Sequence, residues 1–457
     1  NTDFAQVEED QQEINLTRFS LFFPEKRDFF LEGQSIFAFG GVQQLGGGGS
    51  ARPGVQNSEL TPIMFFSRRI GLTDEGEDPI RVGGRVTGRS GAYRIGALDI
   101  QTRGVEENPL IPATNFSVLR LRRDFLARSD IGLIGTYRNT SPTEGASSNS
   151  LFGVDGNFAF FQNLQINSYY AVSRTPLEGG GSVGDDQASY IGNLTYAGDR
   201  YGLILEHLYV GENFEPELGF LRREDFRRSF AQGRFSPRPQ SIESIRRFVF
   251  QGEIDYITDP GGRVETQIAQ GLFRIEFENS DQAWVEYNND FEFLPEEFEV
   301  YPDVILPVGE YQFQDVRLVY VLGAQRLVPS TTTFRTGSFF SGDRTETTFN
   351  GRVELSQKFS LEPRLSLNWV DLPEGSFDTR LVSARVNYTF SPRMYVSSFI
   401  QYNSRSDSLS ASVRFRWEYE PGSDLFVVYS EGREELSIEP FLATRSIAVK
   451  FTKLFRF

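Results

Sequence analysis

Apolar and polar residues alternate with a period of two along most of the chain. From Leu409 the odd positions are apolar or aromatic as far as Tyr419, and the even positions from Ser410 to Glu420 are polar or charged. The same alternation occurs over residues 349–356 and 382–390 and around Phe273 and Tyr287. Because successive side chains of a β-strand point to opposite faces, the pattern predicts strands with one apolar and one polar face.

Roughly 22 alternating segments of about 8 to 15 residues follow one another from about Thr61, separated by turn residues. Alternation alone fits a soluble sandwich as well as a membrane barrel. The lengths of the connections between segments distinguish the two folds. If a strand at 61–70 runs outward, every second connection is short: Arg89 to Gly91, Phe161 to Asn163, Ala197 to Arg200, Ser391 to Arg393 and Glu420 to Ser423. The intervening ones are mostly longer: Gly104 to Thr114, Asn139 to Ser150, Thr175 to Gln187, Gly211 to Asp225, Phe293 to Glu310 and Glu431 to Arg445.

Long connections on one side and short turns on the other are typical of outer-membrane barrels. We therefore expect an all-β fold, a transmembrane antiparallel β-barrel of about 22 strands (range about 18–22), with a short non-barrel N-terminal segment. The expected division is a plug or linker over residues 1–60 and the barrel over 61–457. The expected location is the bacterial outer membrane, in contact with its lipid and lipopolysaccharide, with an even strand number and the C-terminus in the periplasm.

The last segment is amphipathic and ends in an aromatic residue. One face carries Ile447, Val449, Phe451, Phe455 and Phe457, and the other carries Ala448, Lys450, Thr452 and Arg456. Lys453 and Leu454 interrupt the alternation. A terminal aromatic on such a strand is similar to the signal that the barrel-assembly machinery recognises, so Phe455 and Phe457 are the candidate assembly signal. The alternative is a strand that merely ends in phenylalanine.

Composition excludes several other classes of protein. Phe (43) and Tyr (18) far outnumber Met (2), which favours strands over helical bundles. No run of about 18 apolar residues is present and the mean hydropathy is −0.35, so a helical membrane protein is excluded. The net charge of −16 argues against nucleic acid as a partner. Cysteine is absent, which removes disulfides, thiolate nucleophiles and cysteine metal sites.

Residues 1–60 do not alternate. A glycine run, Gly46 to Gly49, follows a cluster of aromatic and charged residues. The cluster consists of Phe22, Phe23, Pro24, Glu25, Lys26, Arg27, Phe29, Phe30 and Glu32. Aromatic side chains together with both signs of charge suit packing inside a polar lumen, where paired charges avoid being buried alone. We expect this segment to act as a plug. The alternative is a periplasmic linker that leaves the pore open.

These residues carry a resemblance to a known family. The chain resembles a family of bacterial outer-membrane β-barrel proteins of unknown function. The resemblance is carried by the stretches Phe22–Arg27 and Phe29–Gly33, by residues 3–8 and 14–18 before them, and by residues 216–223 and 225–227 after them. In that family the barrel usually follows a carbohydrate-binding-module-9-like domain. The resemblance implies that the chain begins inside a longer protein. No secretory signal is present at Asn1, which agrees with a mature chain or a fragment.

The sequence offers little catalytic chemistry. His207 is the only histidine and shares the parity of Leu203, Leu205 and Tyr209, so it is expected on the apolar face rather than in a triad. The acidic clusters at 74–78 and 296–303 lack EF-hand spacing, and the glycine runs lack the lysine of a phosphate loop. We therefore expect no enzyme activity, no cofactor and no metal.

Charged residues on the polar faces are the remaining candidates, because lumen residues set the selectivity of a pore or hold a plug. The candidates are Arg274, Glu276, Glu286, Arg352, Glu354, Arg385, Arg414 and Arg416. An equally good explanation is that any barrel lumen must be polar. The function expected is a channel or transporter gated by residues 1–60. The alternative is a closed-lumen anchor or assembly platform for a periplasmic or surface partner, either a glycan or a protein.

Overall fold

The computed structural model describes residues 10–41, 60–73, 76–105, 108, 111–177, 180–436 and 439–454, leaving aside the side chains of Glu77 and residues 433–444. About 22 strands, β3 to β14 and β17 to β26, follow one another in a single antiparallel β-barrel. This confirms the predicted fold class. None of the described helices is both long and apolar enough to cross a bilayer.

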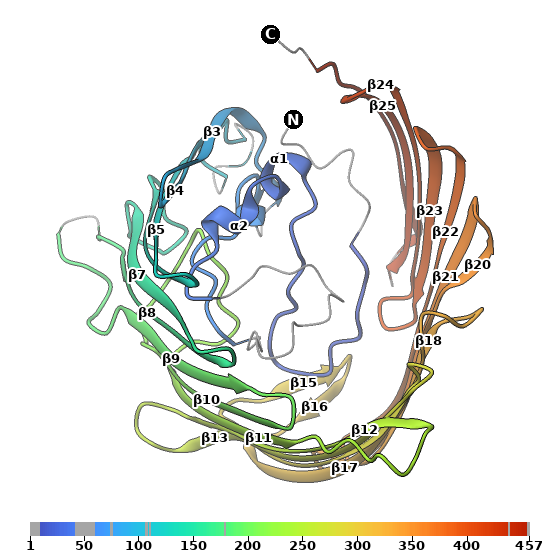
Figure 1. The fold of residues 1–457 in the computed structure, drawn as a ribbon. Helices are drawn as coiled ribbons and strands as arrows, with labels where there is room; N and C mark the ends of the chain where they lie inside the picture. The colour runs from blue at the N-terminus through green and yellow to red at the C-terminus, as the bar shows by residue number, and fades with distance from the viewer. Residues whose placement is uncertain are drawn as a thin grey trace. The chain divides into compact units, whose positions relative to one another are not determined.

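The chain divides into two compact units. The first unit contains Phe19–Arg234 and Glu253–Gln267. Its elements are α1 (Asp28–Leu31), α2 (Gln34–Phe37), η1 (Ser67–Arg69), β1 (Leu72–Thr73), β2 (Gly76–Glu77), β3 (Ile80–Ser90), β4 (Tyr93–Thr102), β5 (Asn115–Phe125), β6 (Ser129–Arg138), β7 (Asn149–Phe160), β8 (Leu164–Arg174), β9 (Ala188–Ala197), β10 (Tyr201–Val210) and nearly all of β11 (Phe226–Phe235). In Figure 1, α1 and α2 lie on one face of strands β3 to β8.

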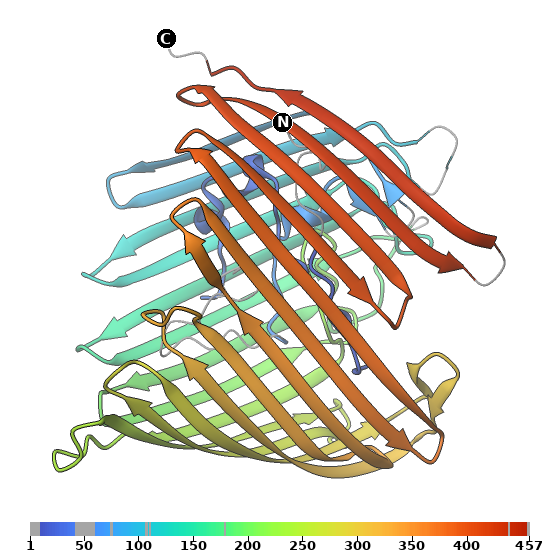
Figure 2. The same ribbon diagram turned by 90° about the vertical axis from the view of Figure 1, so that its right-hand side faces the viewer.

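The second unit contains Phe4–Arg18, Phe235–Gly252 and Ile268–Phe457. Strands β12 (Ile245–Thr258) and β13 (Val264–Phe277) contribute to both units. The others are β14 (Gln282–Leu294), β15 (Phe298–Tyr301), β16 (Val304–Leu306), β17 (Gly309–Leu322), β18 (Ser330–Phe339), β19 (Gly342–Gly351), β20 (Val353–Ser356), β21 (Phe359–Leu372), β22 (Gly375–Ser391), β23 (Met394–Asn403), β24 (Ser408–Glu420), β25 (Ser423–Leu436) and β26 (Glu439–Phe451). Figure 2 shows the long antiparallel strands β21 to β26.

Alternation produces two different faces on each strand, as the sequence predicted. In β5, Phe116, Val118 and Arg120 are buried, whereas Leu119 between them is 58% exposed. Residues 29–41 pack against one face of β3 to β8, and we call it the covered face. The opposite face carries exposed apolar side chains such as Val86 and Phe152. A sheet that exposes this much apolar surface requires an apolar environment or a partner.

Residues 61–70 correct one prediction, because they do not form a barrel strand. The first barrel strand is β3, and Ile63 makes only an isolated bridge to Phe220. Met64, Phe65 and Phe66 are buried in succession, so this segment is enclosed on both sides rather than on one.

The connection lengths agree with the prediction in one part of the chain and differ in another. Connections 103–114, 139–148, 175–187 and 211–225 are long, and 91–92 and 161–163 are short, as expected. The predicted loop 431–445 is wrong, because β25 and β26 occupy most of it. The predicted loop 293–310 is a connection over residues 295–308, and it includes the hairpin β15–β16. Short links at 340–341 and 373–374 also show that the asymmetry weakens after β17.

Candidate functional site

The Arg27 side chain is the most enclosed charge of the N-terminal segment. It is fully buried and forms a two-point ion pair with Glu25, with Nη2 to Oε2 at 2.7 Å and Nε to Oε1 at 2.9 Å. Its Nη1 donates to the carbonyl of Ile70 and its Nη2 to that of Ser67, both at 2.8 Å. The guanidinium also lies 4.2 Å from the centroid of the Phe30 ring. One side chain thus joins the Pro24–Arg27 turn to residues 67–70.

Glu25 completes this network. Its Oε1 accepts the backbone N–H groups of Lys26 and Arg27, each at 2.9 Å, and its Oε2 accepts the Ser67 hydroxyl at 2.8 Å. Burial alone would raise the pKa of this carboxyl, but the hydrogen bonds and charge of Arg27 outweigh burial and hold the pKa below its usual 4.5. The carboxylate is therefore the form that holds the segment in place.

An aromatic cluster links the same region to the second stretch of the family resemblance, residues 216–223. The Phe22 ring lies 5.0 Å from that of Phe66 and 5.2 Å from that of Phe220. Ile63 and Phe220 exchange backbone hydrogen bonds at 2.9 Å, and the Phe66 N–H donates to the carbonyl of Leu218 at 2.7 Å. Residues 60–70 therefore form a bridge between the two sequence motifs, which lie nearly two hundred residues apart.

Arg68 holds the start of the motif. Its Nη1 donates to the Pro24 carbonyl at 3.1 Å, and its guanidinium lies 5.8 Å from the Phe23 ring centroid. The predicted plug residues Phe22 to Arg27 are thus all in one docked turn. The remaining ones, Phe29, Phe30 and Glu32, lie in or beside α1.

The short helices α1 and α2 contact β3 and β4 on the covered face. Arg85 donates to the carbonyl oxygens of Phe29 and Glu32 and pairs with the Glu32 carboxylate at 2.6 Å. Gly96 of β4 leaves room for α2, because a Cβ atom there would lie 3.0 Å from the Phe37 ring. Glycine at this strand position permits the close approach of the helix.

A second buried ion pair holds the segment after α2. Arg120 donates to both oxygens of Asp155, at 2.7 and 2.8 Å, and both side chains are at most 1% exposed. Arg120 Nε also donates to the Ala38 carbonyl at 3.1 Å, and Asp155 accepts the Gly40 N–H at 3.0 Å. The Phe39 ring lies 5.2 Å from the guanidinium. Neither Arg120 nor Asp155 was predicted as a site residue, although their positions on the polar face of their strands were a usable signal.

In the second unit, residues 10–18 contact strands β14, β16, β21 and β23. Gln401 accepts from the Gln12 N–H at 3.1 Å and donates to the Asp10 carbonyl at 3.0 Å. Arg18 pairs with Glu292 at 3.0 Å. Leu16 is buried in a cluster that includes residues 294, 306 and 372.

The predicted lumen charges are each part of a local polar pair. The contacts are Arg274–Glu276 at 3.5 Å, Arg247–Glu276 at 2.7 Å, Arg317–Glu286 at 3.2 Å, Arg352–Glu354 at 2.8 Å, Arg385–Glu362 at 3.6 Å, Arg414–Tyr395 at 3.2 Å and Arg416–Asp424 at 2.9 Å. The structure does not bring them together in one cluster. Their role in selectivity stays a prediction. The predicted assembly signal, Phe455 and Phe457, lies outside the described residues.

His207 lies on the exposed face of β10, as its parity predicted. Its Nδ1 is 3.1 Å from the Ser229 hydroxyl, and its ring lies beside Tyr190. No group of three or more potential metal ligands occurs within the described part of the chain.

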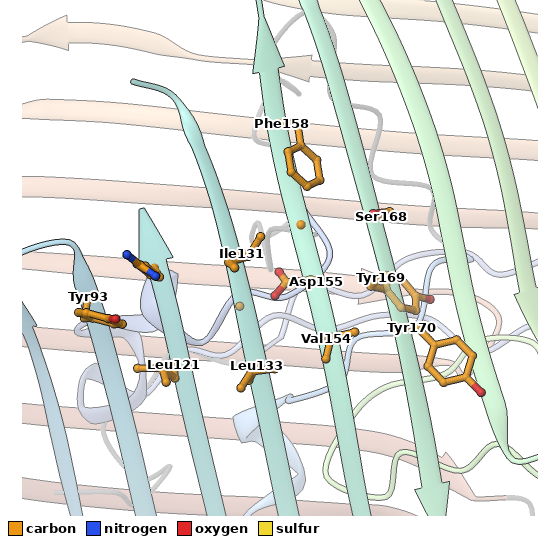
Figure 3. Close-up of a pocket in the computed structure, with 13 residues that line it drawn as sticks. Tyr93, Leu121, Ile131, Leu133, Val154, Asp155, Phe158, Ser168, Tyr169 and Tyr170 are labelled. Atoms are coloured by element: carbon orange, nitrogen blue, oxygen red, sulfur yellow. The ribbon is translucent and has the colours of Figure 1, made fainter. Parts of the chain in front are cut away.

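The exposed face of β4 to β8 carries an apolar groove of about 620 Å³ (Figure 3). Leu121, Ile131, Leu133 and Val154 line it along neighbouring strands. Arg123 stands at its edge, 5.5 Å from the Tyr93 ring centroid. An exposed apolar groove of this kind marks an interaction surface.

We expect acid to release the Pro24–Arg27 turn. The Glu25 pKa is lower in the docked than in the released segment, so its contribution to docking is complete above pH 4.5 and is lost as the pH falls through the depressed value. Limited proteolysis of the N-terminal segment against pH measures this release, with Glu25→Gln as the variant that lacks the acid step. If the segment were released at a pH above neutral, or if Glu25→Gln still showed the same acid-induced release, groups other than Glu25 would control the release.

Replacing Gly153 should loosen the segment after α2. A Cβ at Gly153 would lie 2.6 Å from the Phe39 ring and 3.2 Å from Ile134. Gly153→Ala is therefore expected to cost about 1–3 kcal/mol through overpacking. The matched control is Gly135→Ala, whose Cβ would meet nothing closer than a backbone oxygen at 4.0 Å. Equal thermal midpoints for the two variants would contradict the assigned contact.

Comparison with known proteins adds a short match to this picture. The sequence model of a family described as a domain of unknown function, DUF5916, matches residues 2–43. No curated protein matches the chain. Among solved structures, the crystal structure of Acinetobacter baumannii OccAB3 is similar, with 11% sequence identity, coverage of 64% of this chain and 91% of that chain, and a TM-score of 0.34. The family match thus covers the docked N-terminal segment, including the Pro24–Arg27 turn.

Proposed function

We propose that this chain is an outer-membrane β-barrel that forms a gated conduit, with residues 1–60 as its plug and residues 61–457 as the barrel. The observation that carries the proposal is the seating of the N-terminal segment by two buried ion pairs, Glu25–Arg27 and Arg120–Asp155. Buried charges of this kind are retained where a specific arrangement matters more than stability. The exposed apolar faces of the strands support the membrane location, with lipid and lipopolysaccharide as partners.

A closed-lumen anchor is the second candidate, and one observation favours it. Arg27 has carbonyl, carboxylate and aromatic partners on all sides, so its site resembles a permanent structural contact. In this alternative the barrel serves as a platform for a periplasmic or surface partner. Neither candidate assigns the chain a catalytic role.

Planar-bilayer conductance separates the two candidates. Deletion of residues 1–60 should produce sustained conductance, whereas the intact chain should show only brief openings. A reversible lock provides the second arm, because the chain has no cysteine of its own. A Cβ at Gly33 would lie 3.8 Å from the Thr87 Cβ, a separation that suits a disulfide.

In the Gly33→Cys, Thr87→Cys variant, oxidation should abolish the openings and reduction should restore them. Gly33 has φ +73°, so a cysteine at this position strains the backbone. The reduced double variant carries the same strain and is therefore the reference for the oxidised one. Thr87→Cys alone should show no redox dependence. Silence of both the deletion and the intact chain would favour the anchor. Equal conductance of both would show that the segment does not obstruct a pathway.

A further inference from the structure

A second cavity lies in the first unit, where the long connections meet. It has a volume of about 680 Å³ and is separate from the groove in Figure 3. Its walls come from residues 69–73, Pro112, residues 138–142, and residues 215–224 of the connection between β10 and β11. The volume falls in the range of about 300–1,000 Å³ that is usual for small-molecule sites.

Glu217 is the central polar group of this cavity. Its side chain is only 5% exposed, and one oxygen, Oε1, accepts the Ser141 hydroxyl. The other oxygen, Oε2, has no hydrogen-bond donor among the described residues. A buried carboxylate oxygen without a donor costs free energy, so its presence in a cavity wall points to a ligand.

Arg138 supplies the complementary group. Its Nη1 lies 3.9 Å from Oε2 of Glu217, which is too far for a hydrogen bond. Its Nε is buried and finds no acceptor in the described part of the chain. An unsatisfied acceptor and an unsatisfied donor therefore belong to two neighbouring residues that line the same cavity.

The chemistry of this pair selects a class of ligand. An ammonium group only donates, and a carboxylate or phosphate only accepts, so neither satisfies both atoms. A hydroxyl group can donate to Glu217 and accept from Arg138. Glu215 and Glu224 also line the cavity, and with Glu217 they outnumber Arg69 and Arg138, so the lining is net acidic and disfavours anions. The apolar walls formed by Leu72, Leu221, Pro112 and Pro142 suit the C–H surface of a polyol ring.

We propose that this cavity binds a neutral saccharide, with one ring hydroxyl held between Oε2 of Glu217 and Nε of Arg138. The site goes beyond the conduit function, because binding needs no pathway through the barrel. The saccharide comes either from solution or from a surface glycan such as lipopolysaccharide. Both sources present the same hydroxyl chemistry.

Titration calorimetry on the detergent-solubilised full chain tests the proposal. The probes are glucose, galactose, mannose, maltose and lactose, with glucosamine, glucuronate and lysine as charged comparisons. A polysaccharide fragment freed from lipopolysaccharide forms a separate arm that distinguishes the surface source. We expect at least one neutral saccharide to bind and the charged compounds to bind at least tenfold more weakly.

Glu217→Gln should weaken saccharide binding about tenfold or more, since it removes a charge-assisted hydrogen bond. Leu72→Phe should also weaken binding, because it narrows the cavity without touching the polar pair. Glu212→Gln is the matched control, an exposed acid on the same connection and outside the cavity. Absence of binding by every neutral saccharide, preference for lysine or glucosamine, or equal loss in Glu212→Gln would each overturn the proposal.

Discussion

Arg27→Met is expected to release the N-terminal segment from its seat at neutral pH. The substitution keeps a long side chain but leaves Glu25 buried beside Ser67 without its positive partner. Removing one member of a buried ion pair typically costs about 3–5 kcal/mol. A free energy of this size is enough to move a docked segment from almost fully bound to mostly released. The conductance should therefore rise, and a protease should cleave within residues 19–41.

Two further variants make the result specific to the ion pair. Glu25→Gln combined with Arg27→Met removes both charges and should recover part of the docking, because no uncompensated charge remains. Lys26→Met changes the neighbouring charge, which is only half-buried, and should alter docking by about 1 kcal/mol or less. If Lys26→Met released the segment as fully as Arg27→Met, net charge rather than the buried pair would hold it.

The strands were predictable because a barrel imposes a local rule on its sequence. Each residue faces one of two environments, and its odd or even position along the strand identifies the face, as for Leu409 to Tyr419 and for His207. The concentration of Phe, Glu and Arg at 22–32 favours a plug over a linker, because solvated linkers seldom carry so many aromatics. The structure buries Phe30 in an apolar cluster and pairs Glu32 with Arg85. The role of the segment as a plug stays a prediction.

The partners of these residues were not predictable, because they depend on contacts between distant parts of the chain. Pro62 to Phe66 has the apolar content of a strand, yet burial on both sides converts it into the bridge between Phe22 and Phe220. The glycines at 96 and 153 resemble ordinary strand glycines until the helix and the Phe39 ring are placed against them. Parity assigns Arg120 and Asp155 to one face, but only the register of β5, β6 and β7 brings them together.

The second large effect is expected from Asp155→Ala. Asp155 is the acceptor for both terminal nitrogens of Arg120 and for the Gly40 N–H. Its loss leaves a fully buried guanidinium whose remaining hydrogen-bond acceptor among the described residues is the Ala38 carbonyl. We expect a loss of about 3–5 kcal/mol. The loss should be concentrated where Phe39 and Gly40 cross the covered face, which hydrogen exchange of the Gly40 amide reports directly.

The comparison that decides the origin of this loss is Asp130→Ala in the same sheet. Asp130 also pairs bidentately with an arginine, Arg122, but both side chains are 13–14% exposed. No hydrogen bond or ion pair joins either side chain to the described residues of the N-terminal segment. The loss of Asp130 should therefore destabilise the sheet by about 1–2 kcal/mol and leave Gly40 exchange unchanged. Arg120→Met with Asp155→Leu should restore stability but not Gly40 protection, because the sheet then lacks the acceptor for that amide. If Asp130→Ala accelerated Gly40 exchange as much as Asp155→Ala, the effect would come from general loosening of β6 and β7, and the Arg120–Asp155 pair would have no special part in seating the segment.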